Sequence, residues 1–312
     1  MSVPWDLIEI LDRLVSMKDF RIKTGDSTTA DTIFNEYKDQ VSLIVTSPPY
    51  HNAISYKSHS KNSKSNYRLR SELSYINDYQ SLLNKVWASS WSLLKPGGYL
   101  AINVGSVLDN GYHFALPQDI QSEIIKLNNN WEFIRNITWN KVTAGVKRAG
   151  SVIQHALPGY WHPNIMTEHI IIFRKPGQEF KLNSEVPFEW WDPVWDLAPV
   201  PPRTVKHPAP FPEEIPHRLI RMLTSENDIV FDPFNGAGST TKAAFDLNRV
   251  GLGLDLEKKY VDLSIKRIKA NSSVRVNQLT IRPMSAKDFV PGKSKGQTRH
   301  GAGINARGKN VK

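Results

Sequence analysis

Apolar and polar positions along this chain of 312 residues follow two periods, and its first half shows both. Apolar residues three and four apart predict helices, at 4–17, 31–40, 74–94 and 119–129. Apolar runs between these helices predict buried strands, at 21–24, 41–45, 99–105 and 131–141. Helices that alternate with buried strands indicate an α/β unit with a parallel sheet.

The α/β pattern is interrupted twice and returns once before the end of the chain. Residues 51–70 are basic and rich in Ser and Asn, which predicts a mobile loop. From 142 to 206 the chain is rich in Pro, Trp and Gly around one apolar strand at 168–175, which we interpret as an insert on the sheet. The pattern resumes at 215–270, and a basic low-complexity tail follows.

The composition favours a nucleic-acid partner and excludes cysteine chemistry. Forty Lys and Arg against 30 Asp and Glu give a net charge of +10. This balance suggests an acidic partner, although ordinary solubility with a basic tail is an alternative. Without cysteine there is no disulfide, no thiolate metal site and no thiol nucleophile. We find no metal-binding pattern, no signal peptide and no apolar run of membrane-spanning length, so we expect a cytoplasmic protein.

The sequence "TSPPY" follows the predicted strand 41–45 directly. Two prolines cannot continue a sheet, so the strand must end here. The simplest explanation is a turn without function. The alternative is a rigid segment that presents Ser47 and Tyr50 at the carboxyl end of a core strand.

A glycine-rich turn, "DPFNGAGST", lies between a predicted strand and a helix. Gly236 and Gly238 allow the backbone to approach a ligand there, and Asp255 ends the next strand, where it is placed to bind ribose hydroxyls. No phosphate-binding lysine pattern accompanies the glycines, which argues against a nucleoside-triphosphate cradle. A tight turn for the glycines and a helix N-cap for Asp255 are the alternatives.

In this order, "TSPPY" and "DPFNGAGST" resemble the S-adenosylmethionine-dependent DNA amino-methyltransferases of the beta group, whose catalytic motif precedes the cofactor motif. The resemblance covers about 20–140 and 203–268. It implies a Rossmann-like, mostly parallel sheet of about seven strands with helices on both faces. It further implies a catalytic and cofactor-binding domain at 1–140 and 203–270, a target-recognition region at 141–202 and a flexible tail at 271–312.

The resemblance also implies S-adenosylmethionine as the cofactor and identifies the segments that hold it. "GDS" resembles the acid on the adenine side, and "VKHPAPFP" resembles the segment that closes over the methionine end, for which a rigid linker is the alternative. The cofactor-binding residues so implied are Asp26, Thr46, His207, Pro208, Phe211, Asp232, Pro233, Phe234, Gly236, Gly238, Ser239, Thr240 and Asp255.

The chemistry assigns the catalytic roles to Ser47, Pro48, Pro49 and Tyr50. An exocyclic amine of a base is a poor nucleophile, so catalysis must hold and polarise its NH2 group. The Ser47 hydroxyl and the Pro48 carbonyl are candidate acceptors, and consecutive prolines make that carbonyl rigid. Tyr50 would stack on a base flipped out of the duplex. Core or rim packing is the alternative for Tyr50.

The target amine remains open between two bases. Methylation at cytosine C5 needs a thiolate and is excluded, which leaves N4 of cytosine and N6 of adenine. In the family, serine before the Pro-Pro pair is usual for N4-cytosine enzymes, so Ser47 favours cytosine. Methylation of RNA or of a protein glutamine, and a DNA-binding module on an inactive scaffold, are more distant alternatives.

Double-stranded DNA is the expected partner, and restriction-modification enzymes of this type share their site with a cognate restriction endonuclease. A monomer and a homodimer are both compatible with the sequence. The candidate DNA contacts are Lys57, Lys61, Lys64, Trp139, Lys141, Lys147 and Arg148. Further candidates for reading the site are Gln154, His155 and Asn164. Solvated faces explain single charges equally well, and core packing explains Trp139.

Overall fold

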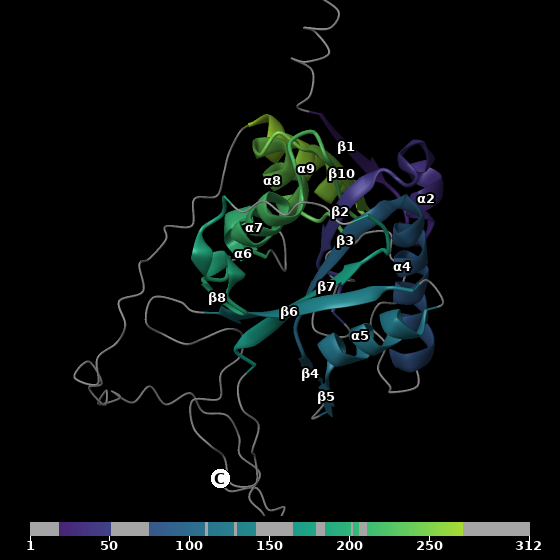
Figure 1. Ribbon diagram of the computed structural model, residues 1–312, viewed down its shortest axis with the longest axis vertical. Helices are drawn as coiled ribbons and strands as arrows, with labels where there is room; N and C mark the ends of the chain where they lie inside the picture. Colours follow the sequence, from purple (N-terminus) through teal and green to yellow (C-terminus); the bar gives the residue numbers. More distant parts are fainter. Residues whose placement is uncertain are drawn as a thin grey trace, which may run out of the picture. The chain divides into compact units, whose positions relative to one another are not determined.

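Eight strands form one sheet in this computed structural model (Figure 1). Their order across the sheet is β1 (Phe20–Thr24), β10 (Val250–Asp255), β9 (Ile229–Asp232), β2 (Val41–Thr46), β3 (Leu94–Val104), β7 (Thr167–Arg174), β6 (Glu132–Lys141) and β8 (Val194–Leu197). Strand β7 is antiparallel to both neighbours, whereas the other pairs run parallel. The mostly parallel sheet expected from the sequence is confirmed, with one strand more than the expected seven.

The structure describes residues 19–50, 75–109, 112–127, 130–141, 165–178, 185–200, 202–205 and 211–270. These residues belong to a single unit that spans 1–277. The predicted opening helix, the predicted loop at 51–70 and the tail from 271 lie outside the described residues. Within the described part of the chain, no helix is long and apolar enough to cross a membrane.

Helices cover both faces of the sheet, as expected (Figure 1). On one face lie α2 (Ala30–Ile33), α4 (Ser81–Leu93) and α5 (Leu116–Lys126), and a π-helical turn, Tyr75–Gln80, leads into α4. On the other lie α7 (Glu214–Leu223) and α8 (Ser239–Asp246), with α9 (Lys258–Lys269) beside α8. The short α6 (Pro202–Val205) precedes α7, and a separate hairpin pairs β4 (Val107–Asp109) with β5 (Tyr112–Phe114).

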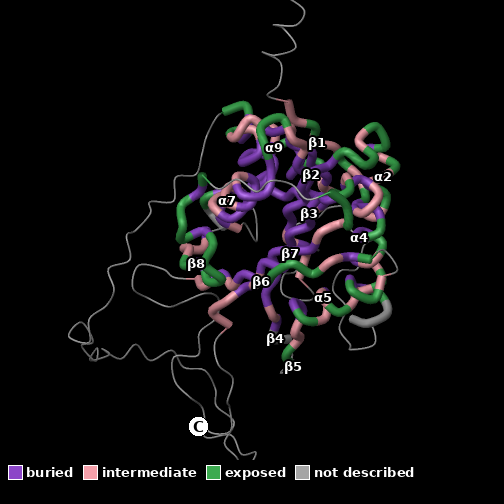
Figure 2. The backbone as a smooth tube through the Cα atoms, in the orientation of Figure 1, coloured by how far each residue is buried: buried purple, intermediate pink, exposed green. Residues whose placement is uncertain are grey.

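Alternate residues of the central strands supply two separate cores. Ile44 of β2 and Leu100 of β3 point into the core beneath α4, whereas Leu43 and Val45 point into the core beneath α7. Side chains of a strand alternate between the faces of a sheet, so a strand with both faces covered is apolar throughout. This explains why all of β2 is buried, as the purple centre of Figure 2 shows.

Strand β3 begins earlier than the sequence predicts. The helix predicted at 74–94 and the strand predicted at 99–105 leave "KPGG" between them as a separate turn, but α4 ends at Leu93 and β3 starts at Leu94. The strand passes through the turn-like residues because Gly97 adopts a φ of 82° and its amide donates to the Lys175 carbonyl at 2.9 Å. The expectation of a separate turn was therefore wrong.

Two strands of the sheet come from the region 141–202. The predicted apolar strand at 168–175 is confirmed as β7, which lies between β3 and β6. Strand β8 was not expected, and its Trp195 is buried in the core beneath α7. These strands belong to the sheet, so the region is not wholly an insert upon it. Its role in target recognition stays a prediction.

Candidate active site

The two sequence motifs meet at one edge of the sheet. Thr46 ends β2, Asp232 ends β9 and Asp255 ends β10, and these three strands are parallel neighbours. Ligands of open α/β sheets bind outside the carboxyl ends of such strands. The fold therefore brings "TSPPY" beside "DPFNGAGST", although the motifs lie far apart in the sequence.

A buried hydrogen bond joins the motifs directly. The Thr46 hydroxyl donates to Oδ1 of Asp232 at 2.7 Å, and the amide of Phe234 donates to the same oxygen at 3.0 Å. Asp232 is only 1% exposed. Burial raises the pKa of this carboxyl to about 6, against the opposing effect of these hydrogen bonds. Asp232 thus connects the end of β2 to the glycine loop.

The glycine loop depends on left-handed backbone conformations. Gly236 has a φ of 49° and Gly238 a φ of 80°, where side chains other than hydrogen are strained. A Cβ on Gly238 would lie 2.1 Å from Oγ of Ser264, closer than any real contact. Ser264 in turn accepts a hydrogen bond from Nδ2 of Asn235 at 3.0 Å. Glycine at 238 is therefore a steric requirement of the packing against α9.

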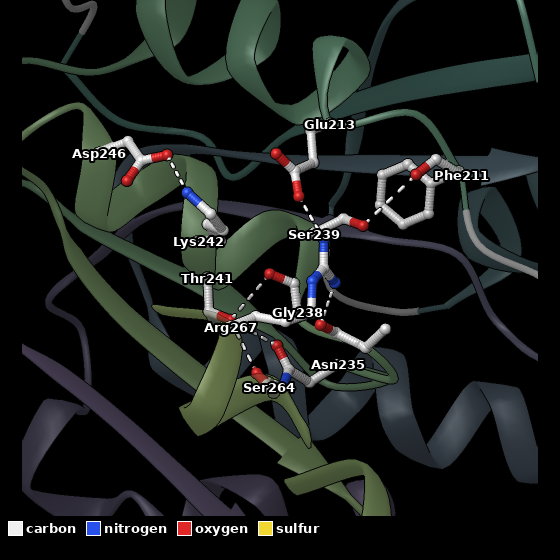
Figure 3. Close-up of polar contacts among 11 residues, drawn as sticks. Phe211, Glu213, Asn235, Gly238, Ser239, Thr241, Lys242, Asp246, Ser264 and Arg267 are labelled. Carbon is white, nitrogen blue, oxygen red and sulfur yellow. Dashed lines mark hydrogen bonds and ion pairs between the residues drawn. The ribbon is translucent and has the colours of Figure 1, made fainter. Parts of the chain in front are cut away.

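An arginine from α9 holds the loop from the side (Figure 3). The Arg267 guanidinium donates to the Ala237 carbonyl and pairs with the carboxylate of Glu213, just before α7. Burial lowers the pKa of Arg267 and raises that of Glu213. The hydroxyl of Ser239 donates to the Phe211 carbonyl at 3.4 Å. The loop, α9 and the segment before α7 thus form one connected unit.

Asp255 lies against the same loop. Its Oδ2 accepts from the Gly236 amide at 2.9 Å and its Oδ1 from the Glu257 amide at 2.8 Å. Burial raises the pKa of Asp255 to about 6. The N-cap of α9 is Glu257, so the alternative that Asp255 occupies that position is wrong. The remaining lone pairs of the carboxylate are acceptors for a ligand.

The segment "GDS" lies beside Asp255. The Gly25 amide donates to the Asp255 carbonyl at 3.0 Å, and the Ser27 hydroxyl donates to the Pro233 carbonyl. Asp26 is exposed and accepts two bonds of 2.9 Å, from the amide and the hydroxyl of Thr28. The sequence-predicted acid after β1 therefore lies at the same edge of the sheet as Asp255, and its role in binding a cofactor stays a prediction.

The residues after β2 contact a second group of side chains. Tyr79 donates its hydroxyl to the Pro49 carbonyl at 2.8 Å, and Tyr50 donates to Oε2 of Glu168 at 2.7 Å. Ser47 is half-buried and Pro48 buried. Glu168 was missed in the sequence, where the only signal is one acid at the head of an apolar strand. Rigid support from Tyr79 and Glu168 fixes the path of the "SPPY" segment.

Trp139 is a correction. We expected it at the DNA surface, but its side chain is 2% exposed in the core beneath α7, and its indole N–H donates to the Leu197 carbonyl at 2.8 Å. The core-packing alternative is the one that the structure favours. Lys141 forms an ion pair with Glu168 and lies over the Trp139 ring, 5.2 Å from its centroid. Lys141 and Tyr50 therefore contact the same carboxylate, that of Glu168.

Several predicted residues lie outside the described part of the chain. Their roles stay predictions, and they are Lys57, Lys61, Lys64, Lys147, Arg148, Gln154, His155, Asn164, His207 and Pro208. Two further residues were missed by sequence reasoning, Glu213 and Arg267. Arg267 follows Tyr260 and Ser264 at helical spacing on the buried face of α9, which is the signal that would have found it.

The fold is an open, mostly parallel α/β sheet, and the two sequence motifs lie side by side at the carboxyl ends of its strands. The model of a family described as DNA methylase, which covers N6 and N4 amino-methylation, matches residues 41–266. Because this match spans most of the chain, the protein belongs to the N6/N4 DNA methylase family.

Relatives and solved structures agree with this family. The chain is 30% identical to the Type II methyltransferase M.MjaI of Methanocaldococcus jannaschii over 275 residues, 76% of this chain and 87% of that protein. It is 29% identical to the Type II beta methyltransferase M.BslI of Bacillus sp., of which it spans 27% against 79% of its own length.

Two structures resemble the fold. A putative DNA modification methylase of Thermus thermophilus, TTHA0409, in complex with S-adenosyl-L-methionine, has a TM-score of 0.60 at 29% identity, over 80% of this chain and 93% of that one. The cytosine-N4-specific PvuII DNA methyltransferase has a TM-score of 0.59 at 18% identity, over 80% and 86% of the two chains. The latter likeness concerns the fold alone.

Proposed function

We propose that the protein transfers a methyl group from S-adenosylmethionine to the N4 amine of cytosine within a specific site of duplex DNA. The observation that carries this proposal is the Thr46–Asp232 hydrogen bond of 2.7 Å, which places the "SPPY" segment against the glycine loop. A methyl donor bound at the loop and an amine held at Ser47 would then lie next to each other. Modification of DNA within a restriction-modification system fits the Type II relatives.

The donor set of the loop fits this cofactor. S-adenosylmethionine carries a ribose diol and two cationic centres but no phosphate, and it supplies an activated methyl group when bound. Asp255 keeps acceptor capacity for the ribose hydroxyls, and Gly25, which precedes Asp26, donates its amide to the Asp255 carbonyl. Asp232 is too buried for easy contact with a ligand, so we propose that it acts by positioning Thr46 and the loop.

The "SPPY" segment provides the chemistry on the base. Ser47 and the Pro48 carbonyl accept hydrogen bonds from the amine and orient its lone pair toward the methyl group. The target base must be flipped out, because its amine is paired inside the duplex, and Tyr50 stacks on the flipped base. The hydroxyl of Ser47 favours cytosine as the target, as serine does in the family. The region 141–202 would read the surrounding site.

The test is methylation of unmodified phage DNA with labelled S-adenosylmethionine, followed by digestion and mass spectrometry of the nucleosides. We expect N4-methylcytosine, and sequencing of the modified positions should give one short site. N6-methyladenine in its place would overturn the choice of base and leave the reaction class intact. Absence of transfer together with absence of cofactor binding in calorimetry would overturn the whole proposal.

A matched pair of variants assigns the role of Ser47. Ser47→Ala should lower the turnover at least tenfold, because one acceptor for the amine is lost, and cofactor affinity should change little. Ser81→Ala removes an exposed hydroxyl at the start of α4 and should leave turnover unchanged. An equal turnover for both variants would exclude Ser47 from the reaction.

A further inference from the structure

Glu168 is a charged residue in an apolar strand. It is 7% exposed in β7, between β3 and β6, and the following residues Ile170, Ile171 and Ile172 are core residues. Burial of a carboxylate is costly unless it is paired and hydrogen-bonded. Because apolar residues of similar volume are often at least as stable as a buried ion pair, stability alone does not explain Glu168.

The two carboxylate oxygens of Glu168 contact different partners. Oε2 accepts from the Tyr50 hydroxyl at 2.7 Å and from Nδ2 of Asn103 at 2.6 Å, and Oε1 pairs with Lys141. The side-chain oxygen of Asn103 is buried and has no hydrogen-bond partner within the described part of the chain. The orientation of this amide is therefore set by Glu168.

A glycine provides the space for this group. Gly105 follows β3, and a Cβ there would lie 2.8 Å from Cγ of Glu168 and 3.5 Å from Cε2 of Tyr50. The absent side chain lets the carboxylate and the phenol ring approach the same backbone. The three partners of Glu168 thus come from three places in the chain: after β2, on β3 and at the end of β6.

We propose that Glu168 is a positioning residue that holds the Tyr50 ring for stacking on the target base and ties it to Lys141. This inference rests on the proposed function. One carboxylate thereby connects Tyr50 after β2 to Lys141 at the end of β6. Glu168 acts through Tyr50 and does not itself touch the base.

A double-mutant cycle tests this connection. Glu168→Gln keeps the shape of the side chain and removes its charge, and Tyr50→Phe keeps the ring and removes the hydroxyl. Each should lower the single-turnover rate on phage DNA about tenfold, with the cofactor dissociation constant within twofold of the wild type. The double variant should be no slower than either single one, because both act on one interaction.

Glu132→Gln is the matched control, since Glu132 lies on the neighbouring strand β6 and pairs with Arg174 away from the site. It should keep the wild-type rate. A further readout is the fluorescence of 2-aminopurine at the mapped target position, which should report a changed base environment in Glu168→Gln and Tyr50→Phe only.

Each outcome decides the inference. Additive losses, of about a hundredfold in the double variant, or a parallel loss of cofactor affinity would make Glu168 merely structural and overturn it. If Glu168→Gln does not fold, Tyr50→Phe alone decides, and a loss below twofold overturns the proposal. A wild-type protein that methylates no DNA would overturn the proposed function and this inference together, whereas an active wild type with an additive cycle overturns only the inference.

Discussion

Gly238→Ala tests the steric account of the cofactor loop. The substitution adds one methyl group at a residue with a φ of 80°, and this group would lie 2.1 Å from Oγ of Ser264. Either the loop or α9 must move. Since Ser264 accepts from Asn235 at 3.0 Å, a shift of the serine also weakens that hydrogen bond.

Three effects set the magnitude. A left-handed conformation costs alanine about 1–2 kcal/mol, and loss of the Asn235–Ser264 bond costs about 0.5–1.5 kcal/mol. The reduced entropy of the unfolded chain offsets about 0.4–1 kcal/mol of this cost. The net expected loss is about 2 kcal/mol in the free energy of unfolding. We also expect at least a tenfold weaker affinity for S-adenosylmethionine, because the loop can no longer keep its path.

Denaturation in urea and calorimetric titration of the cofactor measure the two effects. Gly97→Ala is the matched control: its φ of 82° imposes the same backbone cost, but Gly97 lies in β3, on the other side of β2 from the loop strand β9. It should lose less stability and retain full cofactor affinity. If both alanine variants lost equal stability and bound the cofactor equally well, the packing of Gly238 against Ser264 would not explain the glycine.

Two further predictions concern the buried carboxyls. Burial raises the pKa of Asp255 to about 6, so cofactor affinity measured by calorimetry should fall as the pH decreases from 8 to 5. Asp255→Asn should bind the cofactor weakly at pH 8, and its affinity should not change with pH. A wild-type affinity independent of pH would contradict this. The pKa of Asp232 is also raised, from 3.8 to about 6. Protonation of Asp232 and Asp255 therefore stabilises the unliganded fold fully below about pH 4, and this stabilisation is lost as the pH rises through 6. The Thr46 hydrogen bond favours the ionised form of Asp232. Thr46→Val should therefore lower the free energy of unfolding by about 1–3 kcal/mol at pH 8, and by less at pH 5. The exposed Thr32→Val should show no such difference, and an equal loss at both pH values would exclude an ionised Asp232.

The parts of the fold that could be predicted from the sequence are those whose signal is local. Strand β2 is apolar at four of its six positions, and α4 repeats its apolar residues at helical spacing. The antiparallel direction of β7 and its place between β3 and β6 have no local signal, because strand order is decided by packing of the whole sheet. Likewise, β8 is only four residues long and lacks a clear period.

The candidate site shows the same division between local and distant signals. Gly238 could be predicted because a strand-to-helix turn requires a special backbone conformation. Glu168 could not, because its partner Tyr50 lies 118 positions away and a single acid does not specify a partner. Trp139 was misplaced for a related reason: an aromatic residue in a strand has the same appearance whether it faces the core or a base.

The two halves of the candidate site, the glycine loop and the "SPPY" segment, are held by side chains from different elements. Arg267 holds the glycine loop from α9, and Glu168 holds Tyr50 from β7. Between them stands the Thr46–Asp232 bond, a buried contact that spans both motifs. In-line methyl transfer requires donor and acceptor to be held within a fraction of an ångström, and effective positioning is lost when either support moves. Substitutions at the two outer supports should therefore separate cofactor affinity from turnover, whereas a change at Thr46 should reduce both.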